Sequence, residues 1–217
     1  MDPRKLSNCQ SSYDRIAEEY AARIAGELEH KPLDCMLLDE FAARFRGAGS
    51  VCDLGCGPGH VARYLHDRGV DILGIDLSPG MLEQARKLNP DVEFQQGNLF
   101  ELAARDGAWV AIVAFYSIVH IPKTDILQAL REMFRVLAPR GLLFLAFHIG
   151  VDVLNEENCW GHPVSLDFVL YGRKEVERYL GLVGFAIEDS LERDPYGPEV
   201  EYQTRRAYIR ARKPGPA

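Results

Sequence analysis

Three glycines lie within five residues at Gly55, Gly57 and Gly59, directly after a short apolar run that contains Asp53. Each glycine costs extra backbone entropy on folding, so such a cluster needs a physical reason. A glycine-rich turn between a strand and a helix lets the backbone approach a ligand closely, with the first helix amides pointing at it. We therefore expect residues 51–60 to form a ligand-binding turn, the alternative being a plain tight turn.

Two carboxylates accompany this turn. Asp53 stands two residues before the first glycine, where it is badly placed against a pyrophosphate but can accept hydrogen bonds, directly or through water, from a ligand ammonium group. Asp76 follows Gly59 by seventeen positions, at the end of the next apolar run, where a carboxylate can accept from both hydroxyls of a free ribose. The alternative for Asp76 is that it caps a helix. His60 occupies the place of the third glycine of a dinucleotide-binding turn.

Later segments add polar groups and rings that can meet a ligand. The stretch 96–99 follows the third apolar run, where backbone and the short side chain of Asn98 can meet the edge of a purine. His120 follows the fourth run and His148 ends the fifth. Either imidazole can act as a general base if its pKa lies near neutrality, the alternative being a hydrogen-bonded histidine without a catalytic role.

The elements that must position these residues alternate between short apolar runs and helical periodicity, which predicts parallel strands joined by crossover helices. The run at 109–115 is apolar on consecutive positions, as expected for a central strand that is covered on both faces. Residues 139–141 predict a type I turn. We expect helices at 10–28, 33–45, 60–68, 80–88, 124–137 and 173–182, strands at 51–54, 72–75, 92–94, 109–115, 142–147, 185–191 and 202–211, and an irregular excursion at 151–171.

In their order and spacing, these motifs resemble those of class I S-adenosylmethionine-dependent methyltransferases, over about residues 50–148. The matching residues are Asp53, Gly55, Gly57 and Gly59 for the glycine loop, Asp76 for the ribose, Asn98 and Leu99 for the adenine turn, and Phe115 for the end of the fourth strand. The segment Tyr13 to Tyr20 reads Tyr-x-x-Ile-Ala-x-x-Tyr and is similar to a helix that closes over the cofactor in the small-molecule branch. A core-facing aromatic stripe is the alternative for these two tyrosines.

The resemblance implies an α/β fold with a Rossmann-like seven-stranded sheet in the order 3-2-1-4-5-7-6, strand 7 antiparallel, and helices on both faces. It further implies one methyltransferase domain over residues 1–217. The expected parts are an N-terminal helical lid (1–47), a cofactor-binding core (48–150), the substrate-side excursion (151–171) and a C-terminal helix with strands (172–212).

The implied cofactor is S-adenosylmethionine, with S-adenosylhomocysteine as the product, and no metal is expected. The implied cofactor-binding residues are Tyr13, Tyr20, Asp53, Gly55, Cys56, Gly57, Gly59, Asp76, Leu77, Met81, Gly97, Asn98, Leu99, Phe115 and Tyr116. The candidate substrate contacts are Tyr116, Trp160, His162, Glu201, Tyr202 and Arg206, and the candidate bases are His120 and His148. Methyl transfer to an oxygen or nitrogen of a small metabolite is an in-line displacement, in which the protein mainly aligns the reactants and excludes water.

The amino-acid composition limits the classes of partner that the protein is expected to bind. Scattered basic residues, 25 against 32 acidic ones, argue against a nucleic-acid partner, because phosphate binding needs concentrated positive charge. The apolar runs are too short to cross a bilayer and the first thirty residues do not resemble a signal, so we expect a cytoplasmic protein without a membrane partner. Five cysteines without a Cys-x-x-Cys pair predict neither disulfides nor zinc. The open alternatives are a non-catalytic S-adenosylmethionine-binding protein and a nicotinamide-dependent oxidoreductase.

Overall fold

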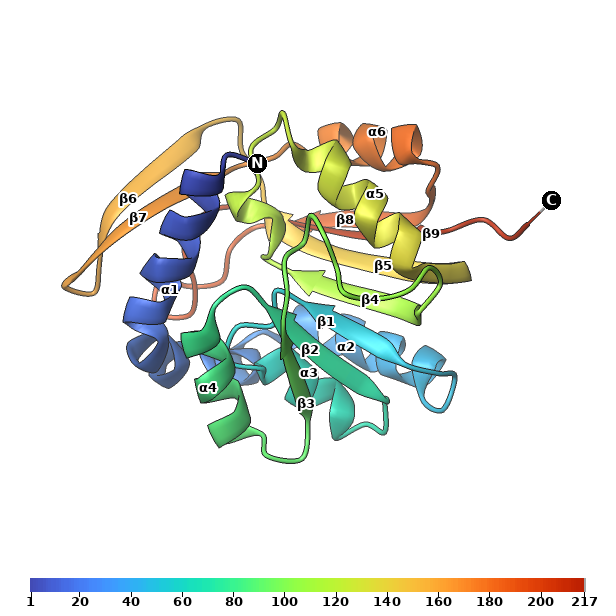
Figure 1. Ribbon diagram of the computed structural model, residues 1–217, viewed down its shortest axis with the longest axis horizontal. Coiled ribbons are helices and arrows are strands. Elements are labelled where there is room, and N and C mark those ends of the chain that lie inside the picture. The colour runs from blue at the N-terminus through green and yellow to red at the C-terminus, as the bar shows by residue number, and fades with distance from the viewer. Residues whose placement is uncertain (217) are drawn as a thin grey trace.

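The computed structural model describes residues 1–216, and its centre is a seven-stranded sheet in the order β3-β2-β1-β4-β5-β9-β8 (Figure 1). The strands are β1 (Val51–Leu54), β2 (Ile72–Asp76), β3 (Glu93–Gln96), β4 (Trp109–Phe115), β5 (Leu137–His148), β8 (Ala186–Arg193) and β9 (Arg206–Arg212). Strands β3, β2, β1, β4 and β5 pair in parallel, and β9 is antiparallel to both of its neighbours. Because β8 and β9 are the sixth and seventh strands of this sheet in chain order, the predicted order 3-2-1-4-5-7-6 is confirmed.

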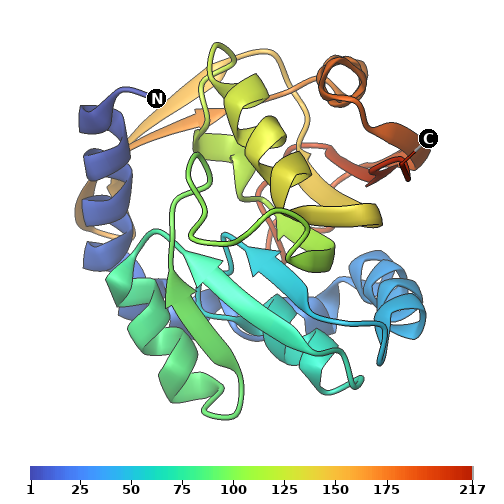
Figure 2. The ribbon, with the colours of Figure 1, turned by 45° about the vertical axis from the view of Figure 1, so that its right-hand side comes forward.

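Helices cover both faces of the sheet (Figure 2). Helices α5 (Ile126–Val136) and α6 (Arg173–Val183) pack on one face, and α2 (Pro32–Phe45), α3 (His60–His66) and α4 (Pro79–Leu88) pack on the other. Strand β4 lies between the two layers, and six of its seven residues are buried, which explains its unbroken apolar sequence. The carboxyl ends of the parallel strands therefore meet at one edge of the sheet that these five helices leave uncovered.

Helix α1 (Pro3–Ile24) lies across that edge, wedged between α4 and strand β7 (His162–Val169). Its apolar stripe joins a small cluster of buried side chains, namely Ile16, Ala17, Met81, Val164 and Leu166. Asp14 fixes the contact with α4, because its Oδ1 accepts hydrogen bonds from Ser78 Oγ at 2.6 Å and from the Gly80 amide at 2.8 Å. A carboxylate at these free helix amides also offsets the positive end of the α4 dipole. Two 3-10 turns, η1 (Glu27–His30) and η2 (Ile118–His120), complete this edge.

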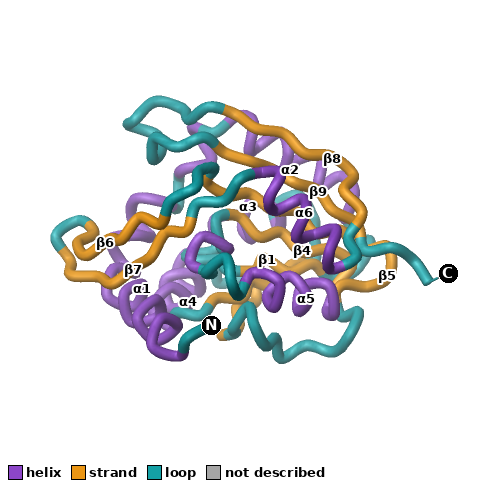
Figure 3. Tube along the Cα trace, turned by 90° about the horizontal axis from the view of Figure 1, so that it is seen from above, coloured by secondary structure: helices purple, strands orange, loops and turns teal. Residues whose placement is uncertain are grey.

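The segment 151–171 is not the irregular excursion that the sequence predicts. It forms an antiparallel hairpin of β6 (Val153–Cys159) and β7, which lies beside α1 (Figure 3). Trp160 and Gly161 connect the strands with φ angles of 52° and 87°, as a type I′ turn requires. The prediction gave weight to the asparagines and glycine of this segment and missed the alternation in β7, where Val164 and Leu166 are buried and Ser165 is exposed.

The turn predicted at 139–141 is also different. A type I turn needs negative φ at both corners, but Arg140 has φ 66°, so the type I prediction is wrong. The segment lies within β5, and two hydrogen bonds hold it, from the Arg140 amide to Lys213 O and from the Lys213 amide to Gly141 O. The conformation of this segment is therefore set by its pairing with Lys213, just beyond β9. Turn preferences of the local sequence do not account for such a long-range contact. Within residues 1–216 no helix is both long and apolar enough to cross a bilayer.

Candidate active site

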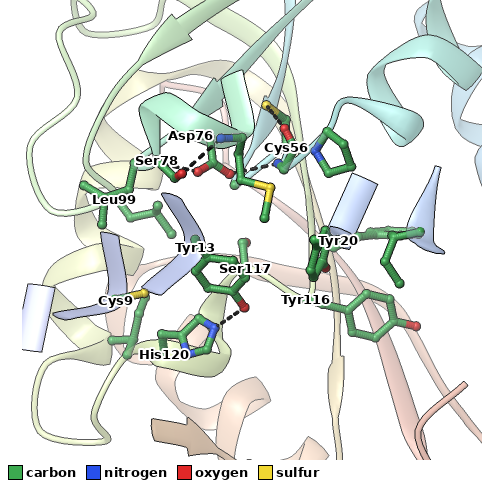
Figure 4. Close-up of a pocket in the computed structure, with 18 of the residues that line it drawn as sticks. Cys9, Tyr13, Tyr20, Cys56, Asp76, Ser78, Leu99, Tyr116, Ser117 and His120 are labelled. Atoms are coloured by element: carbon green, nitrogen blue, oxygen red, sulfur yellow. Dashed lines mark hydrogen bonds between the residues drawn. The ribbon is translucent and has the colours of Figure 1, made fainter. Parts of the chain in front are cut away.

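A cavity opens at the carboxyl edge of the sheet, under α1 (Figure 4). Its volume of about 270 Å³ far exceeds the roughly 10 to 15 Å³ that one water needs on the same measure, so it can hold a small organic ligand. The walls come from α1, the glycine loop, the ends of β2, β4 and β5, and the loop before β9. The cavity thus lies at the switch point where α/β sheets bind ligands.

The glycines of the loop have different surroundings. A Cβ on Gly55, whose φ is 77°, would lie 2.4 Å from the Cβ of Ser117, and one on Gly59 would lie 2.7 Å from the Phe94 ring. These two positions therefore make room for the protein's own side chains. At Gly57, with φ 53°, a Cβ would meet only Tyr20 Cε1 at 3.9 Å. Gly57 is the glycine whose missing side chain leaves space inside the cavity.

We expect Gly57→Ala to fold but to bind S-adenosylhomocysteine several-fold more weakly. The left-handed backbone costs an alanine about 1 kcal/mol, and the added methyl group projects into space that a ligand would use. Thermal unfolding and calorimetric titration measure the two effects separately. Gly161→Ala is the matched control, because Gly161 also has positive φ and open surroundings but lies in the hairpin turn. Equal ligand affinities in the two variants would contradict the placement of Gly57.

Asp76 forms the wall beside this glycine. Its Oδ2 accepts a hydrogen bond from the Gly57 amide and its Oδ1 accepts one from the Ser78 amide, both at 2.8 Å. Burial raises the pKa of the carboxyl group, and the amide hydrogen bonds oppose that rise. Each oxygen keeps a further lone pair, so the carboxylate can still accept from two neighbouring hydroxyls.

Asp53 lies behind the glycine loop and does not line the cavity. Only 2% of the residue is exposed, and its Oδ2 has no hydrogen-bond partner among the described residues. Burial raises its pKa to about 7, against the opposing effect of His60. An orphaned carboxylate oxygen next to a ligand cavity is suited to a cationic or hydrogen-bond-donating group, directly or through water.

The residues predicted for adenine, Asn98 and Leu99, line the cavity, as do Leu77 and Met81 from the predicted cofactor-binding set. Asn98 Oδ1 accepts a hydrogen bond from the Phe100 amide at 3.0 Å, which orients the side chain and leaves its oxygen one more lone pair. Gly97 lies outside the lining.

Tyr13 of α1 meets His120 at the cavity floor (Figure 4). The Tyr13 hydroxyl lies 2.7 Å from Nε2 of His120, and Nδ1 of the same ring lies 2.9 Å from the backbone oxygen of Asp167. Because a carbonyl oxygen only accepts, Nδ1 carries the proton and Nε2 accepts from Tyr13. Burial lowers the pKa of His120 to about 4, so the ring is neutral at pH 7.

The other end of the cavity lies around Tyr116, which directly follows β4 and has a φ of 56°. Lys31 Nζ and the guanidinium carbon of Arg206 lie 5.5 and 5.6 Å from the centre of its ring. The His148 ring packs against it with centroids 5.0 Å apart, and Nδ1 of His148 lies 2.7 Å from Thr204 Oγ1. Burial, followed by the charges of Arg206 and Lys31, lowers the pKa of His148 to about 3.

A buried ion-pair network supports this end. Lys31 Nζ lies 2.7 Å from Glu27 Oε2 and 3.6 Å from Glu201 Oε2. Glu201 also pairs with Arg193 and Arg206, and Arg193 pairs with Asp34 of α2. The network thus joins the start of α2 to the loop before β9, so that two segments far apart in the chain form one wall.

The structure brings most of the predicted residues together. Those lining the cavity are Tyr13, Tyr20, Gly55, Cys56, Gly57, Asp76, Leu77, Met81, Asn98, Leu99, Phe115, Tyr116, His120, His148, Glu201, Tyr202 and Arg206. Those outside the lining are Asp53, Gly59, Gly97, Trp160 and His162. Trp160 packs against Tyr20, with ring centroids 6.0 Å apart.

Several lining residues have no counterpart in the prediction, notably Cys9, Glu27, Lys31, His60 and Ser117. Glu27 and Lys31 stand four positions apart, a spacing that usually indicates an exposed helical ion pair. Their side chains are instead largely buried, with exposed fractions of 13% and 4%. Partners from distant segments hold this pair in the cavity wall, with Nε2 of His60 3.0 Å from Glu27 Oε1 and Glu201 beside Lys31.

Comparisons with known proteins agree with this geometry. Residues 51–141 match the protein-family profile described as "Methyltransferase domain". The chain is 28% identical over 144 residues to malonyl-[acyl-carrier protein] O-methyltransferase of Enterobacter lignolyticus (66% of this chain, 54% of the relative). It is 32% identical over 96 residues to demethylmenaquinone methyltransferase of Beutenbergia cavernae (44% of this chain, 39% of the relative). The chain spans about half the length of the curated relatives it matches.

Among solved structures, the fold is similar to that of the DhpI–S-adenosylhomocysteine complex, with a TM-score of 0.71, 20% identity and coverage of 98% of both chains. A Rossmann-like sheet with a glycine loop and a buried carboxylate at its carboxyl edge is typical of nucleotide-binding α/β proteins. The matching family profile narrows the class of protein further. Residues 51–141 match a methyltransferase domain, and the fold is that of S-adenosylmethionine-dependent methyltransferases of known structure.

Proposed function

We propose that this protein is an active methyltransferase that binds S-adenosylmethionine in the cavity under α1 and methylates an oxygen or nitrogen of a small metabolite. The observation that carries the proposal is the joint position of Gly57 and Asp76, whose direct hydrogen bond at 2.8 Å forms one wall of the cavity. This wall has the space and the acceptors that a nucleoside needs. The relatives named as methyltransferases support the same reaction class.

The residues present fit this cofactor. The two carboxylate oxygens of Asp76 suit ribose hydroxyls, and the orphaned Oδ2 of Asp53 suits an ammonium group reached directly or through water. Asn98 and Leu99 offer one polar and one apolar contact for a purine. When bound, the cofactor supplies a methyl group on a sulfonium centre that is already activated for displacement. Tyr13 and Tyr20 of α1 would cover it and exclude water, which favours an in-line displacement.

Two measurements test the proposal. Calorimetry should show S-adenosylhomocysteine binding without NAD(P) binding, and incubation with methyl-labelled S-adenosylmethionine and a small-molecule extract should give labelled product. Binding of NAD(P) with no response to S-adenosylhomocysteine would instead indicate an oxidoreductase. Binding of S-adenosylhomocysteine without any label transfer would indicate a protein that keeps the cofactor cavity and lacks catalysis.

A further inference from the structure

We propose that the methyl acceptor is an oxyanion, such as a carboxylate or phosphonate, held between Lys31 and Arg206 and methylated on its charged oxygen. This inference rests on the proposed function and names its substrate class. It is carried by two separate features of the cavity, namely the unused cationic donors at its Tyr116 end and the state of its titratable groups.

The first feature is the pair of buried cations with hydrogen-bond donors to spare. Lys31 and Arg206 are 3% and 2% exposed, and both line the cavity. Lys31 Nζ makes one hydrogen bond, to Glu27, and its distance of 3.6 Å to Glu201 is too long for a second. Nε of Arg206 has no partner among the described residues. Buried cations rarely leave donors unused, and an anionic group is the partner that satisfies both.

The balance of charge at this point favours an anion. The groups that face His148 are Arg206 and Lys31, which lower its pKa, and Glu201 and Glu27, which raise it less. The effects of the two cations are therefore larger at this ring, and an anion placed beside it meets a favourable potential. Tyr116, whose ring both cations approach, stays a neutral phenol, since burial keeps its pKa well above the usual value.

The second feature is that the two candidate histidine bases of the cavity, and Glu201 at its Tyr116 end, are poor bases. His120 and His148 have pKa values of about 4 and about 3, and each uses a ring nitrogen on a protein partner. Glu201 is held in ion pairs, and its pKa is lowered although burial opposes this. A hydroxyl or ammonium acceptor must lose a proton during methylation, for which these groups have little affinity at pH 7.

An oxyanion needs no base, and its reaction balances without a proton. One bond forms between the charged acceptor oxygen and the methyl carbon of S-adenosylmethionine. The bond between that carbon and sulfur breaks, and its electron pair stays on sulfur to give neutral S-adenosylhomocysteine. The positive sulfonium and one negative charge of the acceptor disappear together, so the cations need only orient the acceptor.

Product analysis tests this directly on the full chain. The protein is incubated at pH 8 with methyl-labelled S-adenosylmethionine and the small-molecule fraction of a bacterial extract. A carboxylate acceptor gives a methyl ester, which dilute base hydrolyses with release of volatile labelled methanol. A phosphonate or phosphate acceptor gives a base-stable product that elutes from an anion exchanger with one negative charge fewer. In weak buffer, neither reaction releases a proton.

A labelled ether or methylamine, with one proton released per methyl group, would overturn the oxyanion acceptor and leave the methyltransferase proposal intact. Absence of any labelled product would overturn both proposals. The two failures are therefore distinguishable in one experiment.

Variants then test the two cations with the acceptor that the extract yields. Arg206→Gln should weaken binding of this acceptor to the S-adenosylhomocysteine complex at least tenfold, and Arg206→Lys should recover part of the loss. Arg205→Gln is the control, because Arg205 is half exposed and pairs with Glu192 and Asp194 away from the cavity. Lys31→Gln provides a second variant if Arg206→Gln does not fold. Unchanged acceptor affinity in a folded variant of either cation would contradict its place in the site.

Discussion

Asp76→Ala is expected to weaken the binding of S-adenosylhomocysteine by about 30-fold or more, which corresponds to about 2 kcal/mol. The substitution removes the carboxylate that would accept from both ribose hydroxyls. It also frees the amides of Gly57 and Ser78, each of which donates a hydrogen bond to Asp76 at 2.8 Å. The glycine loop therefore loses its fixed position together with the contact, and both losses weaken binding.

Calorimetric titration of the variant measures this change, and a matched acid on the same strand separates it from general effects. Asp71 stands just before β2, at the end remote from the cavity, and accepts a hydrogen bond from Ser50. Asp71→Ala should leave the affinity for S-adenosylhomocysteine unchanged. If Asp76→Ala unfolds at the wild-type temperature and binds the ligand equally well, the ribose assignment is wrong.

The parallel part of the sheet is predictable because its signals are local. Strands β1 and β4 have the predicted bounds, and ten of their eleven residues are buried. The hairpin β6–β7 is not predictable in this way, because a Trp–Gly pair such as Trp160–Gly161 is an unusual turn between two strands. Its β7 strand gains its burial from α1, a partner 150 residues earlier in the chain.

The residues of the site divide in the same way, into those marked by local sequence signals and those placed by long-range contacts. Gly57, Asp76 and Asn98 are found from sequence because each follows a strand at a fixed offset. Lys31 and Ser117 are not, because their place depends on tertiary contacts, with Glu201 in one case and with the space left by Gly55 in the other. The proposed cofactor half of the cavity is therefore largely encoded in local motifs, and the proposed acceptor half is assembled from distant segments.

Asp53→Asn is expected to stabilise the folded protein at alkaline pH while weakening its affinity for S-adenosylhomocysteine. Burial raises the pKa of Asp53 from 3.8 to about 7, so the folded state holds the proton more tightly than the unfolded state. The stability contribution is most favourable below pH 4, falls as the pH rises through 7, and is fully lost above that pH. The loss amounts to about 4 kcal/mol, from about three pKa units at 1.36 kcal/mol each.

Thermal unfolding of both proteins between pH 4 and pH 9 measures this difference. The variant should exceed the wild type in unfolding temperature at pH 9, and the advantage should shrink towards pH 4. Asp71→Asn serves as the control, because Asp71 is exposed. An advantage that does not vary with pH would mean that Asp53 is not a strained, ionised group. The loss of stability caused by ionised Asp53 has a functional reason if its unpaired oxygen serves ligand binding. The same variant should then bind S-adenosylhomocysteine more weakly, because an amide cannot offset the charge of the ligand's ammonium group.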